Sequence, residues 1–486
     1  MSAVQGMALA ELLEGFVAAP VAEVTVSGLC EDSRRVVPGD AFVAVRGASA
    51  DGHAFAAAAA DRGAAVILAE RAVAGVAVPV IEVPELRRRR GALAARLHHD
   101  PGAALHCVGV TGTNGKTSIA HYIADLAGRV GRSAGYLGTI GWGRVGALQP
   151  ARLTTEDPLT LQARLAALRD DGCTWAVLEV SSHALAQDRV VDVPFRTAVF
   201  SNLSRDHLDY HESAEDYAEA KARLFCWPGL DLAVLNSDDA FGRELLGRLP
   251  ATARGISYGR EGADVTWRDL DFSSGSARGR WLTPWGEAPL RLPVQAEFSV
   301  ANAAAALAVL CASGVALADV VDAALELSPV PGRMERFGAP GGPAVVVDYA
   351  HTPDALEKVV AALRPATAGK LVCVFGCGGD RDPGKRPLMA AAVEALADEL
   401  WLTSDNPRSE DPLAIIADMR AGLAGRVPAH ECADRRDALA RALAGATFGD
   451  TVLVAGKGHE DYQEICGERR PFSDRAVVEA LLEGSR

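Results

Sequence analysis

The chain has 486 residues, of which 49% are hydrophobic and 23% are charged, and its net charge is −14 at neutral pH. The length predicts roughly three domains, and the acidic charge argues against a general nucleic-acid or membrane-surface binder. No apolar stretch reaches roughly 18 residues without a charge, so we expect no membrane span. The nine unpatterned cysteines favour a reducing compartment, and the acidic N-terminal segment does not resemble a signal peptide. These features predict a cytoplasmic protein.

Residues 1–103 are expected to form a first domain that mixes short strands with helices. Strands are predicted at residues 21–26, 41–45 and 65–68, and an alanine-rich helix at residues 54–62. Asp32, Ser33 and Arg34 stand in a turn between two of these strands. The run Arg87 to Arg90 is the one basic cluster, and its acidic neighbours favour a solvated helix face.

The most informative segment is Gly109-Val110-Thr111-Gly112-Thr113-Asn114-Gly115-Lys116-Thr117, which follows an apolar run and precedes a predicted helix at residues 119–130. A strand that breaks into a glycine-rich turn and reopens as a helix forms a phosphate cradle, in which Lys116 contacts the terminal phosphates and Thr117 binds Mg²⁺. Strict Walker spacing requires a glycine where Val110 stands, so this is a variant loop. A chance Gly-Lys-Thr turn is the alternative, and the flanking strand and helix argue against it.

Residues 104–330 are expected to form the central domain around this loop. Buried strands predicted at residues 176–180, 197–200 and 233–235 alternate with helices, which indicates a doubly wound, mostly parallel sheet. The segment 263–294 is expected to add an antiparallel element. A long helix is predicted from about Ala301, and residues 328–332 form a linker.

Two strand ends in the central domain carry candidate metal ligands. Glu179 lies at the end of a buried strand, where a carboxylate is costly unless it meets a cation or a donor. His207 follows another strand end and has charged neighbours: Arg205, Asp206 and Asp209. With Thr117 and nucleotide phosphates, these residues form a candidate Mg²⁺ site. A core histidine remains the alternative for His207, and by its residue type alone Lys221 is predicted to be a surface lysine on a helix.

Residues 331–486 are expected to form a third domain that repeats the strand–helix alternation. Strands are predicted at residues 344–347, 371–375, 399–402 and 451–454. A polar motif follows each strand: Asp348-Tyr349-Ala350-His351, Gly376-Cys377-Gly378-Gly379-Asp380-Arg381, Thr403-Ser404-Asp405-Asn406-Pro407-Arg408 and Ala455-Gly456-Lys457-Gly458-His459-Glu460. Open α/β sheets bind ligands at the carboxyl ends of their strands. An ordinary turn explains a single motif of this kind, but it does not readily explain all four motifs together.

With these motifs, the chain resembles the Mur ligases, and within that family the MurE type, from Asp32-Ser33-Arg34 to Phe472-Ser473-Asp474-Arg475. The phosphate loop is shared by Mur ligases and folylpolyglutamate synthetases, whereas the segments 179–183, 202–211, 348–354 and 405–408 are more specific. The resemblance implies an α/β, three-domain architecture. It comprises an N-terminal UDP-substrate-binding domain, a central P-loop ATPase domain with a doubly wound sheet, and a C-terminal Rossmann-like domain that binds the amino acid.

The reaction implied by the resemblance is ATP-dependent amide ligation in peptidoglycan precursor synthesis. The enzyme would add meso-2,6-diaminopimelate to the D-Glu γ-carboxylate of UDP-N-acetylmuramoyl-L-Ala-D-Glu through an acyl phosphate, with ATP and Mg²⁺ as cofactors. Independently of the resemblance, a monomer is the default expectation. A carboxylate alone does not react with an amine, so the phosphoryl group supplies the leaving group. Catalysis is then mostly positioning and neutralisation of phosphate charge.

The resemblance also assigns site residues by the motifs they match. Catalytic roles fall on Lys116, Glu179, His207 and Lys221, and the metal ligands are Thr117, Glu179, His207 and Lys221 in carbamylated form, which overturns the surface interpretation of that lysine. ATP-binding positions are Gly112, Thr113, Asn114, Gly115, Lys116, Thr117, Ser118, Asn302, Arg333, Asp348 and His351. The UDP-linked substrate is assigned to Ser33, Thr154, Thr155, Ser181, Gln187 and Arg189. Diaminopimelate is assigned to Arg381, Asp405, Asn406, Pro407, Arg408, Gly456 and Glu460.

The choice of amino acid depends on Arg408, which lysine-adding relatives lack. Diaminopimelate carries a second carboxylate that an arginine can clamp bidentately, while Glu460 suits an ammonium. A site built around an unpaired arginine should reject lysine by roughly 10³-fold or more.

Some positions depart from the family pattern and leave the acceptor site open to more than one interpretation. Glu31 precedes Asp32 where an apolar residue is common, and Glu156-Asp157 follow Thr155 in a variable loop. A Mur-like paralogue with another acceptor or amino acid, such as L-lysine, could keep every ATPase motif. A folylpolyglutamate-type ligase, a phosphotransferase and a non-catalytic Mur-like binding protein are three competing hypotheses. In a non-catalytic protein we would expect the site residues to be substituted, whereas in this chain they are intact.

Overall fold

The computed structural model describes residues 6–18, 23–47, 50–207, 209–260, 262–272, 276–338 and 341–484. The chain divides into two compact units. One unit comprises Met1–Gly109, Arg132–Thr197 and Cys226–Asp231; the other comprises Val110–Gly131, Ala198–Phe225 and Leu232–Arg486. The predicted domain boundaries after residues 103 and 330 stay predictions.

The N-terminal segment forms a small parallel sheet and a separate strand pair. The strands are β1 (Met7–Ala8), β2 (Thr25–Val26), β3 (Gly28–Cys30), β4 (Asp40–Ala44), β5 (Val66–Ala69) and β6 (Val80–Glu82), and the helices are α1 (Leu9–Leu12), α2 (Ala56–Asp61) and α3 (Leu86–Leu97). Strands β3 to β6 pair in parallel in chain order, whereas β1 pairs with β2 antiparallel. The strands predicted at 41–45 and 65–68 are confirmed. Of the strand predicted at 21–26, only Thr25 and Val26 are paired, and residues 21 and 22 lie outside the described residues.

The central region contains a seven-stranded sheet in the order β13-β12-β11-β7-β10-β8-β9. Its strands are β7 (His106–Thr111), β8 (Ala134–Gly138), β9 (Gly141–Gly143), β10 (Trp175–Glu179), β11 (Phe195–Phe200), β12 (Leu232–Asn236) and β13 (Arg254–Tyr258). The helices are α4 (Lys116–Arg129), α5 (Pro158–Asp170), α6 (Ser182–Ala186), α7 (Ala214–Ala222), α8 (Ala240–Arg248), α9 (Glu297–Ala312) and α10 (Leu317–Ala324). The pairs β8–β10 and β12–β13 are parallel, as predicted for a doubly wound sheet, and β9 is an antiparallel edge strand.

The antiparallel addition expected within residues 263–294 is confirmed. Strands β14 (Thr266–Asp271), β15 (Ala277–Thr283) and β16 (Gly286–Leu292) form a three-stranded antiparallel sheet. The Trp281 side chain of β15 is almost fully buried and lies edge-on to Trp267 of β14. Aromatic packing therefore supports this sheet.

The C-terminal region forms a six-stranded sheet in the order β17-β18-β22-β19-β20-β21, all parallel except β17. Its strands are β17 (Glu335–Gly338), β18 (Ala344–Asp348), β19 (Leu371–Cys377), β20 (Glu399–Ser404), β21 (Ala429–Cys432) and β22 (Thr451–Ala455), and β23 (Tyr462–Ile465) pairs with β24 (Glu468–Pro471). The helices are α11 (Pro353–Leu363), α12 (Lys385–Glu394), α13 (Pro412–Arg420), α14 (Arg435–Gly445) and α15 (Asp474–Gly484). The four strands predicted from the sequence are confirmed.

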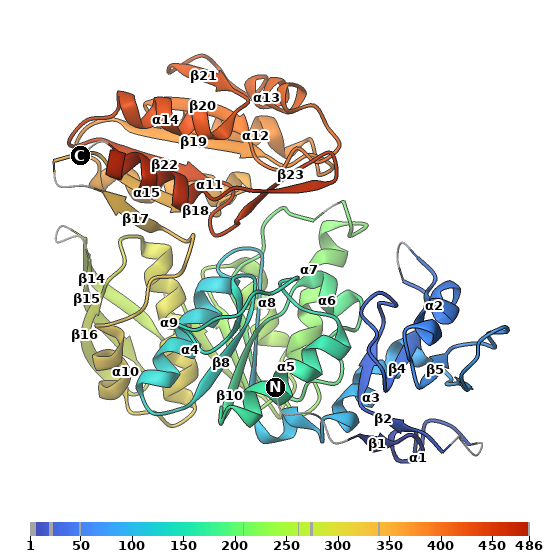
Figure 1. Ribbon diagram of the computed structural model, residues 1–486. Coiled ribbons are helices and arrows are strands. Elements are labelled where there is room, and N and C mark those ends of the chain that lie inside the picture. The colour runs from blue at the N-terminus through green and yellow to red at the C-terminus, as the bar shows by residue number, and fades with distance from the viewer. Residues whose placement is uncertain are drawn as a thin grey trace. The chain divides into compact units, whose positions relative to one another are not determined.

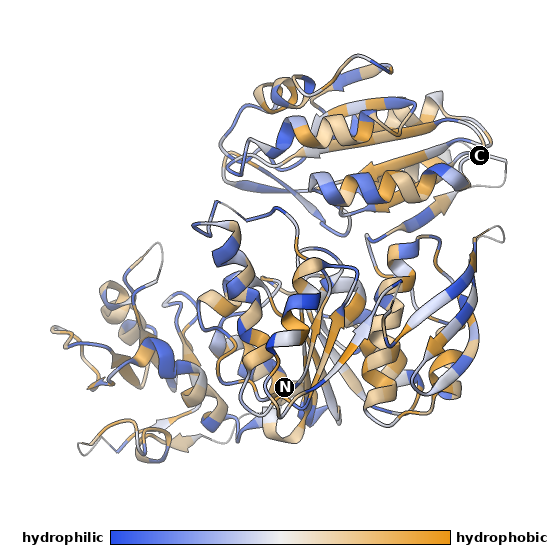
Figure 2. Cartoon of the chain, turned by 180° about the vertical axis from the view of Figure 1, so that it is seen from behind, coloured by the Kyte–Doolittle hydropathy of each residue, from blue (hydrophilic) through white to orange (hydrophobic). Residues whose placement is uncertain are grey.

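Both faces of this C-terminal sheet are covered by helices (Figure 1). Val345 and Val347 of β18 pack with α14 and α15, whereas Val346 packs with α11, α12 and α13. Burial on both faces explains why the sequences of these strands are continuous apolar runs. Figure 2 shows the strands as hydrophobic arrows between helices that carry both hydrophobic and hydrophilic residues. Because β18, β22, β19 and β20 are parallel, their carboxyl ends and the polar motifs that follow lie at one edge of the sheet.

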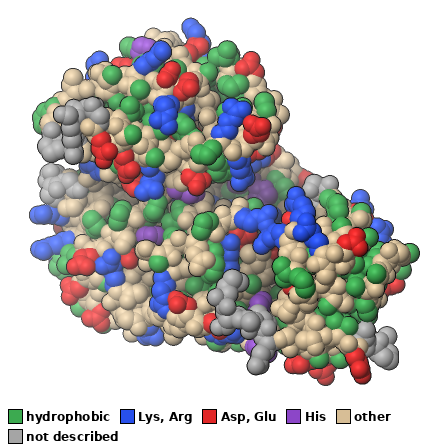
Figure 3. Space-filling model, in the orientation of Figure 1, with side chains coloured by type: hydrophobic (Ala, Val, Ile, Leu, Met, Phe, Trp, Pro, Cys, Tyr) green, Lys and Arg blue, Asp and Glu red, His purple; other side chains and the backbone are tan. Residues whose placement is uncertain are grey.

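The surface and the helices agree with the acidic, mixed composition. On the face seen in Figure 3, acidic and basic side chains are interspersed. No helix within the described ranges is long and apolar enough to cross a bilayer.

Candidate active site

The phosphate loop connects β7 to α4, as the sequence predicts. Gly112 and Gly115 have φ angles of +142° and +86°, and a Cβ atom would lie 1.9 Å from Ser201 Oγ at Gly112 and 2.8 Å from Asn302 Oδ1 at Gly115. Only glycine fits such positions. The predicted ATP-binding residue Asn302 of α9 therefore lies against the loop. The loop also contacts the segment after β11, where Asn202 Oδ1 accepts a hydrogen bond from the Asn114 amide nitrogen at 3.0 Å.

Two lysines meet at this loop. Lys116 Nζ donates to the carbonyl oxygens of Gly112 (2.9 Å) and Thr113 (2.7 Å). Lys221 Nζ also donates to the Gly112 carbonyl, at 2.9 Å, and lies 4.2 Å from the centre of the Tyr217 ring. Lys221 is 1% exposed, so the interpretation as a surface lysine is wrong: α7 directs it to the loop rather than to solvent. Burial, followed by the charge of Lys116, lowers the pKa of Lys221 well below its usual value.

Residues of the C-terminal region reach the helix that follows the loop. Arg333 Nη2 donates to Thr117 Oγ1 at 3.3 Å, and its guanidinium lies 4.3 Å from the centre of the Tyr349 ring. The buried Asp348 carboxylate accepts hydrogen bonds from the amide nitrogens of Met334 and Ala350, both at 2.7 Å. Asp348 therefore fixes the backbone beside Arg333, and burial raises the pKa of Asp348.

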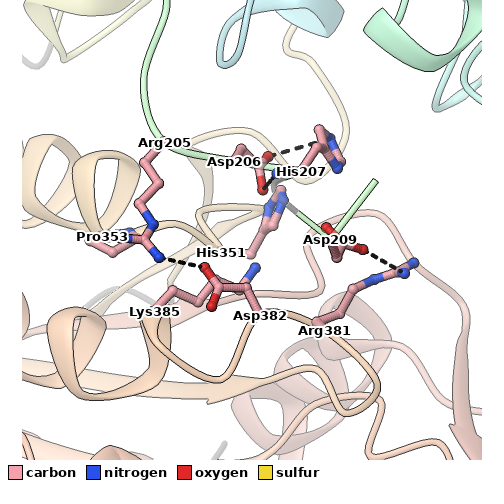
Figure 4. Close-up of a pocket in the computed structure, with 9 residues that line it drawn as sticks. All are labelled: Arg205, Asp206, His207, Asp209, His351, Pro353, Arg381, Asp382 and Lys385. Atoms are coloured by element: carbon pink, nitrogen blue, oxygen red, sulfur yellow. Dashed lines mark hydrogen bonds and ion pairs between the residues drawn. The ribbon is translucent and has the colours of Figure 1, made fainter. Parts of the chain in front are cut away.

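A cavity in the same compact unit holds further predicted residues (Figure 4). Its lining is Arg205, Asp206, His207, Asp209, His351, Pro353, Arg381, Asp382 and Lys385. Ion pairs join Arg205 to Asp382 at 3.2 Å and Arg381 to Asp209 at 3.5 Å. The predicted metal ligand His207, the predicted nucleotide contact His351 and the predicted diaminopimelate contact Arg381 thus line one cavity.

The charges around Asp206 make this cavity electrostatically mixed. Burial raises the pKa of Asp206, but the neighbouring His207, His351 and Lys385 outweigh it and lower that pKa to about 2. His207 Nε2 lies 3.4 Å from Asp206 Oδ2, and burial and Lys385 lower the pKa of His351. The cavity therefore combines the carboxylates of Asp206, Asp209 and Asp382 with the cationic side chains of Arg205, Arg381 and Lys385.

Glu179 ends β10 and is 1% exposed. Its Oε1 accepts from the Tyr136 hydroxyl and, at 2.9 Å, from the Thr139 amide nitrogen, and its Oε2 accepts from Thr139 Oγ1 at 3.0 Å. These donors satisfy the buried carboxylate, as its position at a strand end requires.

Most residues predicted for the UDP-linked substrate gather beside Glu179. Thr155 Oγ1 donates to the Glu179 carbonyl at 2.8 Å and accepts from the Ser181 amide nitrogen at 3.1 Å. Arg189 Nη1 donates to the Thr155 carbonyl at 3.0 Å, and its Nε donates to Gln187 Oε1 at 2.9 Å. Thr139 links Thr154 to this group through a 3.1 Å hydroxyl hydrogen bond. Ser33 stands in the turn between β3 and β4.

The acidic residues that depart from the family pattern have structural partners. Glu156 is buried against Arg164 at 2.8 Å, and Asp157 caps α5 by accepting from the Thr160 amide nitrogen at 2.9 Å. Glu31 pairs with Arg90 at 3.1 Å, so the last arginine of the basic run is not solvated as predicted. The Arg90 side chain is 12% exposed.

The predicted amino-acid site lies at the carboxyl edge of the C-terminal sheet. Arg408 has a φ angle of +50°, and its backbone is held by β23: its amide nitrogen donates to the Glu464 carbonyl at 3.0 Å, and its carbonyl accepts from Cys466 at 2.7 Å. Its Nη1 donates to the Gly379 carbonyl at 2.6 Å. Asn406 Nδ2 donates to Glu460 Oε2 at 2.9 Å. Loops that follow β19, β20 and β22 are thereby joined.

Three further positions complete this group. The Gly379 amide nitrogen donates to the Asn406 carbonyl at 2.9 Å, and the Pro407 carbonyl accepts from Glu410 at 3.0 Å. Gly456 has a φ angle of +112°, and a Cβ there would lie 2.6 Å from Asp405 Oδ2. The predicted residues Asp405, Asn406, Pro407, Arg408, Gly456 and Glu460 are therefore brought together.

Sequence reasoning did not select Lys457 as a site residue. Its side chain is 0% exposed and contacts both Asn406 and Glu460. The sequence carries a signal for it, because Lys457 stands between Gly456 and Glu460 in the polar motif that follows β22.

The residues predicted to bind magnesium have suitable chemistry. The Thr117 hydroxyl and the Glu179 carboxylate are oxygen donors of the type that Mg²⁺ prefers, together with phosphate oxygens. Within the described ranges, no group of three or more His, Cys, Asp and Glu side chains is arranged to hold a metal ion. The role of these residues stays a prediction.

Comparison with known proteins gives a consistent result along the chain. Three family models match: "Mur ligase family, catalytic domain" over residues 25–98, "Mur ligase middle domain" over 110–310, and "Mur ligase, glutamate ligase domain" over 332–458. A protein of Chromobacterium violaceum named UDP-N-acetylmuramoyl-L-alanyl-D-glutamate--2,6-diaminopimelate ligase is 50% identical over 460 residues, covering 93% of each chain. A Pseudomonas aeruginosa protein of the same name is 47% identical over 466 residues, covering 95% of this chain and 96% of its own.

Solved structures agree with the sequence comparison. A structure with that same ligase name is 38% identical, aligns with a TM-score of 0.70 and covers 99% of each chain. The predicted fold class is confirmed. From its family-model matches and its full-length relatives, this chain belongs to the Mur ligase family.

Proposed function

We propose that this chain is an ATP-dependent ligase of peptidoglycan precursor synthesis. It adds meso-2,6-diaminopimelate to the D-Glu γ-carboxylate of UDP-N-acetylmuramoyl-L-Ala-D-Glu. The names of its relatives, at 47–50% identity over nearly the full length, support this reaction. All nine cysteines are free, which fits a cytoplasmic enzyme, and we expect it to act as a monomer.

One observation carries the amino-acid choice: a guanidinium and a carboxylate occupy the same edge of the C-terminal sheet. Arg408 follows β20, and Glu460, which follows β22, is tied by a 2.9 Å hydrogen bond to Asn406, two residues before the arginine. Diaminopimelate carries both an ammonium and a carboxylate at the end where lysine carries only an ammonium. A guanidinium matches that extra carboxylate bidentately.

The reaction proceeds in two steps that the acyl phosphate links. The D-Glu carboxylate oxygen attacks the γ-phosphorus of ATP, the bond to the β-phosphate oxygen breaks, and ADP leaves. The amine nitrogen of diaminopimelate then attacks the activated carbonyl carbon. The tetrahedral intermediate collapses with cleavage of the carbon–oxygen bond, which releases phosphate and a proton and leaves the amide. Positioning and electrostatic stabilisation supply most of the catalysis in such transfers.

The residues of the phosphate loop have distinct roles in this proposal. Lys116 contacts the terminal phosphates, and Asn302 and Arg333 hold the nucleotide beside the loop. Mg²⁺, when bound, neutralises phosphate charge, and we assign its ligands to Thr117, Glu179, His207 and carbamylated Lys221. The low pKa of buried Lys221 favours its neutral amine, whose nitrogen bonds to the carbon of CO₂ with loss of a proton.

The UDP-linked substrate is assigned to the polar group beside Glu179. That group contains Thr154, Thr155, Ser181, Gln187 and Arg189, with Ser33 on the β3–β4 turn. It offers hydroxyl, amide and guanidinium donors, which suit an anionic nucleotide-linked peptide.

The test measures ATP-dependent phosphate release with UDP-N-acetylmuramoyl-L-alanyl-D-glutamate, comparing meso-diaminopimelate with L-lysine. We expect release with diaminopimelate and a tripeptide product of matching mass. Equal use of lysine would contradict the role of Arg408 while leaving a ligase. Failure with both amines would contradict the proposed acceptor.

A further inference from the structure

A buried lysine lies in the centre of the predicted amino-acid site. Lys457 Nζ lies 3.0 Å from Asn406 Oδ1, 2.8 Å from Glu460 Oε2 and 3.8 Å from Asp405 Oδ1, and the lysine side chain is 0% exposed. The Tyr462 ring centre lies 5.6 Å from the same nitrogen. Burial of an ammonium is costly unless carboxylates and acceptors surround it, which is the arrangement found here.

The hydrogen bonds around this lysine fix the direction of Asn406. Asn406 Oδ1 accepts from Lys457 Nζ and, at 3.0 Å, from the Glu464 amide nitrogen, while its Nδ2 donates to Glu460 at 2.9 Å. Because both acceptor bonds fall on Oδ1, the amide nitrogen must face the glutamate. Asn406 and Lys457 therefore each donate a hydrogen bond to Glu460 from a fixed direction.

Both of these donors reach the same oxygen of Glu460. Lys457 Nζ and Asn406 Nδ2 bind Oε2, and in the described part of the chain no residue donates to Oε1. The Glu460 side chain is 14% exposed, so one oxygen is anchored while the carboxylate keeps limited access to solvent. A carboxylate anchored through one oxygen presents the other to a ligand in a fixed direction.

The charged and titratable groups near Glu460 come from several elements. They are Asp405 after β20, Lys457 after β22, Tyr349 after β18, Tyr462 of β23 and Arg435 of α14. Burial and then Asp405 raise the pKa of Glu460, whereas Lys457 and Asn406 lower it. Lys457 is the cation in direct contact that opposes protonation of Glu460.

We propose that Lys457 is a positioning residue for the amino-acid substrate, which holds Glu460 ionised and directs its Oε1 to the substrate ammonium. The inference rests on the proposed ligase function and adds a residue to its specificity. We assign Lys457 itself no contact with substrate, because its side chain is 0% exposed. Lys457 acts on the substrate amine only through the Glu460 carboxylate.

The test compares Lys457→Met with wild type in ATP-dependent tripeptide formation. Methionine keeps the length of the side chain and removes its charge. We expect the KM for diaminopimelate to rise about 10- to 100-fold, since truncating one member of a buried charge pair impairs the other. The KM values for ATP and for the UDP-linked dipeptide should change less than about twofold, because the exchange is local. Lys370→Met is the matched control: Lys370 is 65% exposed and lies 3.9 Å from Glu399.

A pH profile separates positioning from a merely structural role. Removal of an opposite charge at this distance moves a carboxyl pKa upward by about 1–3 units. The acidic limb of kcat/KM for diaminopimelate should therefore move to higher pH in Lys457→Met. It should be absent in Glu460→Gln, whose amide cannot titrate, and Lys457→Met/Glu460→Gln should match Glu460→Gln because the two residues act in series.

The outcomes distinguish this inference from the proposed function. If wild type forms no tripeptide with diaminopimelate, the proposed function fails. If wild type is active and Lys457→Met keeps its KM and pH profile, the role of Lys457 fails alone. Should Lys457→Met not fold, the double variant, which removes both charges of the Lys457–Glu460 pair, carries the comparison with Glu460→Gln, and a difference between those two overturns the proposal.

Discussion

Lys116 and Lys221 donate hydrogen bonds to one acceptor, the Gly112 carbonyl oxygen, each at 2.9 Å. Two ammonium groups at a single carbonyl repel each other, and this repulsion adds to burial in lowering the pKa of Lys221. Lys116 is thus the cation at the loop for the predicted anionic phosphates, while Lys221 is shifted toward its neutral amine.

Lys116→Met should reduce tripeptide formation strongly. The change removes the cation that we assign to the terminal phosphates, and loss of one such electrostatic contact typically costs roughly 10²–10³ in kcat. Steady-state phosphate release measures this, with Lys370→Met as the control for a lost surface charge. A kcat within about twofold of wild type would contradict the assignment.

Arg408→Ala should abolish the preference for diaminopimelate over lysine. Arg408 Nη1 is held by the Gly379 carbonyl at 2.6 Å, so the guanidinium is oriented before substrate arrives. Loss of its bidentate contact should raise the KM for diaminopimelate by about 10²-fold or more. Arg408→Lys should recover only part of the preference, because an ammonium lacks the planar fork. Competition between the two amines, with the products identified by mass, measures the ratio of diaminopimelate to lysine incorporated. An unchanged ratio would show that Arg408 does not take part in recognition of the amino acid.

Asp474→Asn should destabilise the C-terminal region. Arg435 and Asp474 are both 0% exposed and 2.7 Å apart, so neutralising the carboxylate leaves a buried guanidinium without its counter-charge. The expected loss is about 3–5 kcal/mol in the free energy of unfolding. Urea denaturation measures it, with Asp437→Asn on the surface of α14 as the control. Equal stability of the two variants would show that the ion pair is dispensable.

Glu31 should make stability depend on pH. Burial raises the pKa of Glu31 to about 7, although Arg90 opposes the shift. The folded state therefore binds protons more tightly than the unfolded chain, and stability falls as the pH rises from about 5 to about 8. Relative to wild type, the free energy of unfolding of Glu31→Gln should increase by about 1–3 kcal/mol across that pH range. Thermal unfolding at both pH values measures the gain, and the exposed Glu82→Gln should show none.

The sequence predicted local features that depend on neighbouring residues. The phosphate loop was predicted because an apolar strand, a glycine-rich turn with Lys116 and Thr117, and a helix follow one another in one short segment. The strands of the C-terminal sheet were predicted because burial on both faces gives continuous apolar runs. Both signals are present in short stretches of sequence.

Features that depend on distant residues were not predicted from residue type and spacing, and the resemblance alone assigned Lys221 to the site. Lys221 is buried because α7 faces a loop more than a hundred positions earlier in the chain, and Lys457 is central because two other loops surround it. In the sequence Glu156 is a departure within the substrate loop, whereas in the structure its partner is Arg164 of α5. Partners of this kind are set by tertiary packing, which residue type and spacing do not encode.

The Arg435 guanidinium has a second set of partners besides Asp474. It donates to the Ser404 carbonyl at 3.2 Å and to the Ala455 carbonyl at 2.8 Å, at the ends of β20 and β22. One side chain thus sets the spacing between the two loops that supply Arg408 and Glu460. Two loops held at a fixed spacing cannot adapt to a new amino acid by moving apart or together. Divergence of substrate preference on this scaffold is therefore expected to proceed through exchange of individual side chains at constant backbone positions.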